Sequence, residues 1–258
     1  MAHWIGFRRG DRHGGGGGFG RLDGTRIAVH EGCLFEEPVA TGETLDLAEV
    51  AIDLPCRPSK LIALWNNFSA LARKLELEQP EAPLFFVKPA NSYAPSGATV
   101  AVPEAAGRVL YEGELAIVIG RRTRDVSEAD AAGHIFGYTC HNDVTAQPLL
   151  KADPSFVQWT RAKGLDGFSP FGPVIATGLD PATLTVRTLV NGRERQNYPV
   201  SDMIFSASRI VSLLSQGMTL EPGDVIACGT STGSGPIPKG ALVEVEIEGI
   251  GTLANRFA

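Results

Sequence analysis

Apolar residues recur along much of this chain at every second position, which is the spacing of β-strands that bury one face. Residues 1–57 contain three short stretches of this kind separated by turn residues, a pattern that predicts a small unit of β-hairpins. Residues 58–258 contain further strand-like runs, few helical stretches and no regular strand–helix alternation. We therefore expect an α+β, mainly β fold, with a small N-terminal β-unit in 1–57 and a larger domain in 58–258.

Local signals place individual elements in the larger domain. An apolar strand in 59–65 leads into an amphipathic helix in 68–78, which the following proline would end. Ser127 is typical of the cap of a short helix, and the pair Asn191 and Gly192 is typical of a hairpin turn. The other expected elements are strands in 83–89, 136–143, 221–230 and 241–249 and a helix near 206–215.

Five successive glycines, Gly14–Gly18, interrupt the N-terminal strands. No Gly-Lys-Ser/Thr motif and no helix start follow them, so a phosphate-binding loop is disfavoured. We expect a flexible hairpin turn at this position, with no chemical role.

Composition narrows the classes of function. The chain has 258 residues, of which 43% are hydrophobic, so it can bury a sizeable core. Its 23 basic and 29 acidic residues give a net charge of -6, and no Lys/Arg run exceeds two residues, which argues against nucleic-acid or membrane-surface binding. The four cysteines are widely spaced, and no apolar run is long enough for a signal peptide or a membrane span. We expect a soluble, cytoplasmic protein with a small-molecule ligand.

The segment "YEGELAIVIG", residues 111–120, places two glutamates in an otherwise apolar strand. Because side chains alternate along a strand, Glu112 and Glu114 point to the same face, and both faces carry apolar neighbours. Two buried like charges without partners would become protonated or require a cation. The segment is therefore a candidate metal site, and the alternative is that arginines such as Arg121 or Arg122 pair with the two glutamates.

A third acidic ligand is predicted in "YTCHNDVTA". Thr139, His141 and Asp143 share one face of this strand, and Asp143 lies at its end, where the chain could bring its carboxylate to the two glutamates. Three oxygen ligands suit a hard divalent cation, most simply Mg²⁺, with Mn²⁺ or Ca²⁺ also possible. This donor set disfavours Zn²⁺.

Six longer motifs occur in order over residues 58–258: "YEGELAIVIGRRTRDVSEADA", "IFGYTCHNDVTA", "QWTRAKGLDGFSPFGPVI", "VNGRERQ", "SDMIFSASRIVSLLSQGMTLEPGDVIACGT" and "VEVEIEGIGTLANRF". Their order and spacing resemble the catalytic domain of the fumarylacetoacetate hydrolase family. The resemblance implies a mixed β-roll or sandwich domain, usually homodimeric, which acts on 2-oxo acids or acylpyruvates with Mg²⁺ or Mn²⁺. The family's Glu-x-Glu pair and later aspartate, which hold the metal, correspond to Glu112, Glu114 and Asp143.

The resemblance also assigns residues around the metal. Lys163 corresponds to a catalytic lysine, whose positive charge would stabilise an enolate; the alternative for Lys163 is a structural ion pair with Asp166. Lys88 matches a common lysine that would lie behind the metal ligands. The family's substrate loop corresponds to "GTSTG", which supplies Gly229, Thr230 and Gly233, and Gln147 replaces an arginine that commonly holds the substrate carboxylate.

One segment departs from the family's pattern. In "NNFSALARK", the positions of the histidine and glutamate that activate water in the hydrolases hold Leu71 and Lys74. We therefore expect decarboxylation or enol–keto isomerisation, which mainly need charge stabilisation, and we assign His141 as a substitute base. The helix in 68–78 is expected to act as a mobile lid.

Two alternative functions stay open. One is C–C bond hydrolysis of an acylpyruvate or fumarylacetoacetate-like substrate, with water activated by the metal, by His141 or by Glu76. The other is a non-catalytic, metal-dependent binder of 2-oxo acids. Turnover that a chelator abolishes would separate an enzyme from a binder.

Overall fold

The computed structural model describes residues 1–10 and 16–258. The first two glycines of the predicted turn Gly14–Gly18 lie outside these residues, and the last two already belong to a strand.

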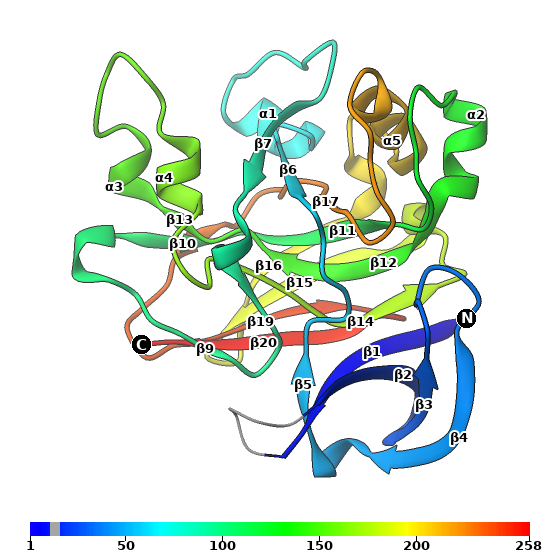
Figure 1. Ribbon diagram of the computed structural model, residues 1–258. Coiled ribbons are helices and arrows are strands. Elements are labelled where there is room, and N and C mark those ends of the chain that lie inside the picture. Colours follow the sequence, from blue (N-terminus) through cyan, green and yellow to red (C-terminus); the bar gives the residue numbers. More distant parts are fainter. Residues whose placement is uncertain (11–15) are drawn as a thin grey trace.

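Most strands form one large sheet (Figure 1). Its strands are β1 (Ala2–Arg9), β2 (Gly17–Asp23), β3 (Arg26–Glu31), β4 (Val39–Asp46), β5 (Val50–Asp53), β6 (Leu61–Trp65), β7 (Leu84–Lys88), β8 (Tyr93–Ala94), β11 (Gly113–Ile119), β12 (Ile135–Asn142), β14 (Ser169–Thr177) and β17 (Val225–Ala227). They run in the order β4-β3-β2-β1-β14-β12-β11-β17-β6-β7, with β5 paired to β1 and β8 paired to β14. Strand β7 therefore lies at one edge of this sheet.

Two smaller sheets complete the β structure. The first has the order β16-β15-β19-β20-β9 and the second the order β13-β10-β18. Their strands are β9 (Thr99–Val100), β10 (Val109–Tyr111), β13 (Thr145–Ala146), β15 (Thr185–Val190), β16 (Arg193–Pro199), β18 (Gly235–Pro236), β19 (Leu242–Ile247) and β20 (Gly251–Phe257). The hairpin turn predicted between β15 and β16 is confirmed, because Asn191 and Gly192 both have positive φ angles.

The helices are short and lie at the end of the molecule away from β1–β5 (Figure 1). They are α1 (Ser69–Lys74), α2 (Glu128–Ala131), α3 (Gln147–Leu150), α4 (Trp159–Lys163) and α5 (Ala207–Ser215). Single 3₁₀ turns are η1 (Leu47–Glu49), η2 (Ala90–Ser92), η3 (Glu104–Ala106), η4 (Ala132–His134), η5 (Pro181–Thr183) and η6 (Val200–Asp202). Strands dominate, so the expected α+β, mainly β class is confirmed. Within residues 1–10 and 16–258, no helix combines the length and the apolar character that crossing a membrane requires.

Strand β11 is packed on both faces. Leu115 and Ile117 belong to a core cluster shared with the sheet that contains β15 and β19. Ala116 and Val118 belong to a second cluster, formed with β6, β14 and β17. All seven residues of β11 are buried, so the expected burial of both faces is confirmed. A charged side chain on this strand therefore has no direct access to bulk water.

The predicted strand in 111–120 is not continuous, which corrects the sequence interpretation. Strand β10 pairs with β13 and β18, whereas β11 pairs with β12 and β17, and the change of partners falls at Glu112. Hydrogen bonds fix this junction, since Glu112 N donates to Asn142 Oδ1 at 3.1 Å and Asp143 N donates to Glu112 O at 2.8 Å. The break joins the ends of β10, β11 and β12 at one point.

Helix α1 ends earlier than the predicted helix in 68–78. Its last turn closes through hydrogen bonds from Glu76 N to Arg73 O and from Leu77 N to Ala72 O. Glu76 has a φ of 55°, so these bonds form a Schellman-type end around a left-handed residue. The chain stops the helix before the proline because Glu76 takes the conformation usually given to glycine. The helix predicted near 206–215 is confirmed by α5.

The N-terminal strands join the rest of the molecule through backbone hydrogen bonds. Strand β1 pairs antiparallel with β14, from Ala2 opposite Thr177 to Ile5 opposite Val174. The large sheet is thus shared between residues before and after the expected boundary at 57/58. The division into two domains stays a prediction.

Candidate active site

Three acidic side chains meet where β10, β11 and β12 end. Glu112 lies between β10 and β11, Glu114 lies on β11 opposite His141, and Asp143 follows β12. One ligand oxygen from each carboxylate lies within 4.8 Å of the other two. Glu114 and Asp143 are each only 1% exposed. Residues 31 positions apart in the sequence thus form a single acidic cluster.

Burial determines the charge states of these carboxylates. The pKa of Glu114 is raised well above its usual value by burial and by the negative charges of Asp143 and Glu112. Burial also raises the pKa of Glu112, although Lys163 opposes this effect. For Asp143, burial alone would raise the pKa, but the nearby Lys163 and Lys88 lower it below its usual value. Asp143 is therefore ionised, whereas the positive charge of Lys163 only partly offsets the effects that raise the pKa of Glu114.

Two buried lysines neutralise part of this cluster. Lys163, at the end of α4, donates to Glu112 Oε2 at 2.8 Å, to Asp143 Oδ2 at 2.5 Å and to Thr145 Oγ1 at 2.6 Å. Burial lowers the pKa of Lys163, but Asp143 and Glu112 outweigh it and raise the pKa above its usual value. Lys88, at the end of β7, donates to Asp143 Oδ1 at 2.6 Å, and burial lowers its pKa to about 8.

The two ion-pair alternatives from the sequence are wrong. Arg122 pairs with Glu221 at 3.5 Å, and among the described residues no arginine lies within 4.0 Å of the Glu112 or Glu114 carboxylate. Asp166 accepts a hydrogen bond from Asn91 instead of pairing with Lys163. The partners of the carboxylates come from β7 and α4, both distant in the sequence.

The cluster fits a hard divalent cation. Its three donors are carboxylates, with no thiolate among them, and such oxygen sets suit Mg²⁺, Mn²⁺ or Ca²⁺. Glu114 accepts one hydrogen bond, from Gly229 N at 3.1 Å. A buried carboxylate with so little compensation, beside two others, is the arrangement that a bound cation would stabilise.

His141 lies behind Glu114 and away from any open cavity. Its side chain is 0% exposed, its Nε2 lies 2.8 Å from Ser169 Oγ, and its Nδ1 lies 3.5 Å from Glu114 Oε2 without a hydrogen-bond partner. Burial is the main reason that its pKa falls to about 3. The structure thus holds a neutral imidazole against the back of a candidate metal ligand.

The expected substrate loop lies beside the cluster. Gly229 binds Glu114 through its N–H, and Thr230 Oγ1 donates to Gly113 O at 3.0 Å and accepts from Gln196 Nε2 at 2.8 Å. Gly233 has a φ of 101°, and a Cβ there would lie 2.4 Å from a backbone oxygen, so this position requires glycine. Gln147 lies apart, exposed at the start of α3.

A cavity of about 230 Å³ opens onto the acidic cluster. The residues that line it are Leu64, Trp65, Asn66, Leu71, Lys74, Leu75, Phe86, Glu112, Glu114, Asp143, Lys163, Thr230, Gly233 and Ser234. It is smaller than typical drug-binding pockets, so it suits a small substrate.

Aromatic side chains form part of the cavity wall, which the sequence interpretation missed. Phe86 stacks on Trp159 with ring centroids 5.2 Å apart, and Trp65 lies 6.0 Å from Trp159. The Lys163 ammonium lies 5.2 Å from the Phe86 ring centroid. Phe86 lies in an apolar strand of the kind that forms a hydrophobic core. Nothing in the sequence therefore distinguishes Phe86 from a residue that only packs in the core.

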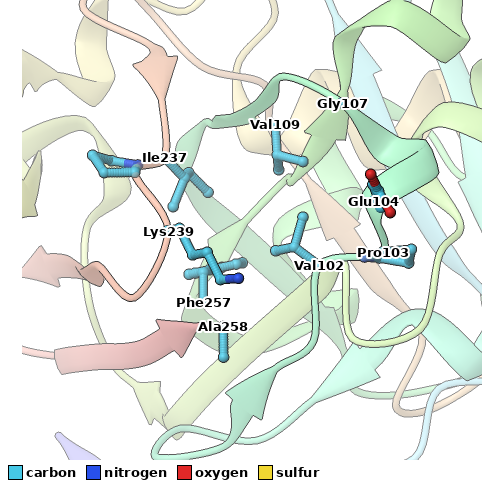
Figure 2. Close-up of a pocket in the computed structure, with 10 residues that line it drawn as sticks. Val102, Pro103, Glu104, Gly107, Val109, Ile237, Lys239, Phe257 and Ala258 are labelled. Atoms are coloured by element: carbon cyan, nitrogen blue, oxygen red, sulfur yellow. The ribbon is translucent and has the colours of Figure 1, made fainter.

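A second cavity, of about 510 Å³, lies near the C-terminus, and none of the three carboxylates lines it (Figure 2). Its charged side chains, Glu104 and Lys239, lie on different sides of a mostly apolar hollow. Among the described residues, the only group of three potential metal ligands is the Glu112, Glu114 and Asp143 cluster. The acidic cluster therefore opens onto the smaller cavity.

The mainly β fold and the buried cluster of Glu112, Glu114, Asp143 and Lys163 are typical of a protein with a metal centre built from carboxylates. The family model for the fumarylacetoacetate (FAA) hydrolase C-terminal domain matches residues 60–258, and one for an Rv2993c-like N-terminal domain matches residues 3–54. The chain belongs to the fumarylacetoacetate hydrolase family, as its motifs predicted.

Relatives in this family include several enzymes. A 2-hydroxyhepta-2,4-diene-1,7-dioate isomerase from Mycobacterium marinum is 38% identical, with a TM-score of 0.90 over 100% of this chain and 98% of that one. The 4-hydroxyphenylacetate degradation bifunctional isomerase/decarboxylase of Escherichia coli is 38% identical over 86% of this chain and 52% of its own length. A fumarylpyruvate hydrolase from Pseudomonas aeruginosa, solved with Mn²⁺ and pyruvate, is 30% identical, with a TM-score of 0.72 over 78% of this chain and 90% of that one.

We predict that replacing Glu114 by Gln lowers the affinity for Mg²⁺ by roughly tenfold or more, because one anionic ligand is lost while the shape is kept. Isothermal titration calorimetry measures the affinity. Glu248→Gln, an exposed change of the same kind, is the matched control and should leave the affinity unchanged. Equal affinities in the Glu114 variant and the unmodified protein would contradict the assignment.

Proposed function

We propose that this protein is a divalent-metal-dependent enzyme that converts a small 2-oxo acid or 1,3-dicarbonyl compound by decarboxylation or enol–keto isomerisation. One observation carries the proposal. The cavity combines the three carboxylates and Lys163 with Leu71 and Lys74, the two residues that the family resemblance aligns with the histidine and glutamate of the hydrolases. The names of the isomerase and isomerase/decarboxylase relatives support the same class. The homodimer implied by the sequence stays a prediction.

The cluster suits a reaction in which negative charge develops on substrate oxygens. A divalent cation held by Glu112, Glu114 and Asp143 would stabilise that charge. Lys163 keeps its proton, since its two carboxylate partners raise its pKa, so it contributes a fixed positive charge rather than a base. The Thr230 hydroxyl, which donates to Gly113 O, would turn to a carboxylate of the substrate, and nearby backbone N–H groups would help to hold it.

The absence of a base on α1 separates this site from a hydrolase site. Leu71 cannot accept a proton, and a lysine at 74 places a cation where the hydrolases have a carboxylate. Glu76 lies beyond the helix end, is exposed and does not line the cavity. Acylpyruvate hydrolysis is the second candidate, because the fumarylpyruvate hydrolase shares the fold.

We further propose that His141 orients Glu114. Its Nε2 can accept the Ser169 hydroxyl proton, which leaves Nδ1–H directed at the Glu114 carboxylate 3.5 Å away. A buried, neutral histidine such as His141 can fill this role. A catalytic base, in contrast, would have to reach the substrate in the cavity, which His141 does not line. The sequence interpretation of His141 as a substitute base is the competing hypothesis.

His141→Gln separates these two roles. If His141 orients a metal ligand, Mg²⁺ affinity should fall about 10- to 100-fold, and saturating Mg²⁺ should restore most of kcat. If His141 is the base, kcat should fall at every Mg²⁺ concentration while the affinity stays unchanged. Calorimetry and turnover measured over a Mg²⁺ titration distinguish the outcomes.

The reaction type is tested with oxaloacetate, an enol–keto substrate and an acylpyruvate in one preparation, with products followed by mass spectrometry. Decarboxylation or isomerisation should be faster than hydrolysis. A chelator that removes the metal should abolish every activity observed. Leu71→His combined with Lys74→Glu should raise hydrolysis selectively, while Lys163→Met should depress every activity, because it removes the fixed charge. Efficient acylpyruvate hydrolysis by the unmodified protein would overturn the preference.

We also predict that the segment 68–78 orders over a bound ligand. Helix α1 has only six residues, and it presents Leu71, Lys74 and Leu75 to the cavity. Oxalate, a flat mimic of an enolate, should slow amide hydrogen exchange in this segment at saturating Mg²⁺. The N-terminal strand β3 serves as the internal control. Identical exchange of 68–78 with and without oxalate would argue against a lid.

A further inference from the structure

The cavity holds two positively charged side chains in different settings. Lys163 is 3% exposed and donates to Glu112, Asp143 and Thr145. Lys74 also ends a short helix, α1, but its side chain is exposed. Lys163 is therefore bound to the acidic cluster, whereas Lys74 lies in a separate part of the cavity wall.

Lys74 has no partner among the described residues. No carboxylate lies within 4.0 Å of its ammonium group, and it makes no side-chain hydrogen bond. Its neighbour Arg73, which does not line the cavity, lies 4.0 Å from Asp202. Of the two adjacent basic residues on α1, only Lys74 lines the cavity. Lys74 is also the one that has no ion-pair partner among the described residues.

Helix α1 places Lys74 at the cavity wall. Ala70 N donates to Asp202 Oδ2 at 2.9 Å at the start of α1, Ala72 is buried, and the left-handed residue Glu76 closes its end. Leu71 and Leu75, three positions before and one after Lys74, line the same wall. The ammonium group thus stands beside apolar side chains, where a negative charge of a ligand would be attracted to it.

We propose that Lys74 binds a second acidic group of the substrate, remote from the oxygens that meet the metal. The substrate is then a dicarboxylate with a 2-oxo acid at one end. Trp65, Leu71 and Phe86 line the cavity as well, so the segment between the two acidic groups is apolar or unsaturated. This inference rests on the proposed function, which assigns the 2-oxo acid to the metal end.

The test compares two ligands of equal chain length, 2-oxohexanedioate and 2-oxohexanoate, which differ only in the remote carboxylate. Affinities are measured by calorimetry at saturating Mg²⁺ for the unmodified protein, for Lys74→Met and for Arg73→Met. Lys74→Met keeps an apolar stem and removes the charge. Arg73→Met makes the same charge change one residue away, outside the cavity, and Lys74→Arg restores the charge.

The unmodified protein should bind the dicarboxylate more tightly. Lys74→Met should weaken that binding about two- to fivefold, the range of an exposed ion pair, and leave the monocarboxylate unaffected. Arg73→Met should change neither affinity, Lys74→Arg should keep the preference, and added salt should reduce it. Oxalate binding, which involves only the metal end, should be equal in all four proteins.

Three results would overturn the inference. An unchanged dicarboxylate affinity in Lys74→Met would make Lys74 a solvated surface residue. An equal loss for both ligands, or a loss of oxalate binding, would make its role structural. If neither 2-oxo acid binds at saturating Mg²⁺, the proposed function fails and the inference fails with it, whereas binding without preference refutes the inference alone.

Discussion

Asp143 accepts hydrogen bonds from two buried lysines, and the rest of the site depends on this pairing. Lys88 comes from the edge strand β7 and Lys163 from the end of α4, so the two bonds tie three distant segments to one carboxylate. Removing one partner of a buried ion pair costs about 3–5 kcal/mol, since it leaves a charge without compensation. The same lysines leave Glu114 largely uncompensated, and a bound cation would offset that imbalance.

The ion pairs also determine the shape of the cavity. Because Lys163 is held at the end of α4, Trp159 at the other end of that helix is brought against Phe86 of β7. Phe86 in turn lies under the Lys163 ammonium group. The aromatic residues of the cavity and its charged residues are therefore in direct contact with each other. The polar and apolar parts of the cavity are therefore not independent, and a substitution at either lysine would disturb both.

How far the sequence could predict this arrangement depends on the range of the interactions involved. The alternation around Glu114, the Asn191–Gly192 turn and the helix before Gln216 are local, and each was predictable from neighbouring residues. The strand break at Glu112 was not, because it arises from a change of partner strands. The early end of α1 was missed for another reason, since a glutamate at position 76 adopts a conformation that usually signals glycine.

The most informative difference between this site and a hydrolase site lies in one charge on α1. A carboxylate at position 74 could help to take a proton from water, and its negative charge would repel an anionic ligand. A lysine at the same position of the cavity wall reverses both effects, because it removes the proton acceptor and attracts an anion. Under the two proposals, Lys74 thus links the reaction type to the substrate specificity of the cavity. Under the proposed function, the reaction needs only charge stabilisation and no activated water, and the carboxylate cluster with its cation and Lys163 would provide that stabilisation.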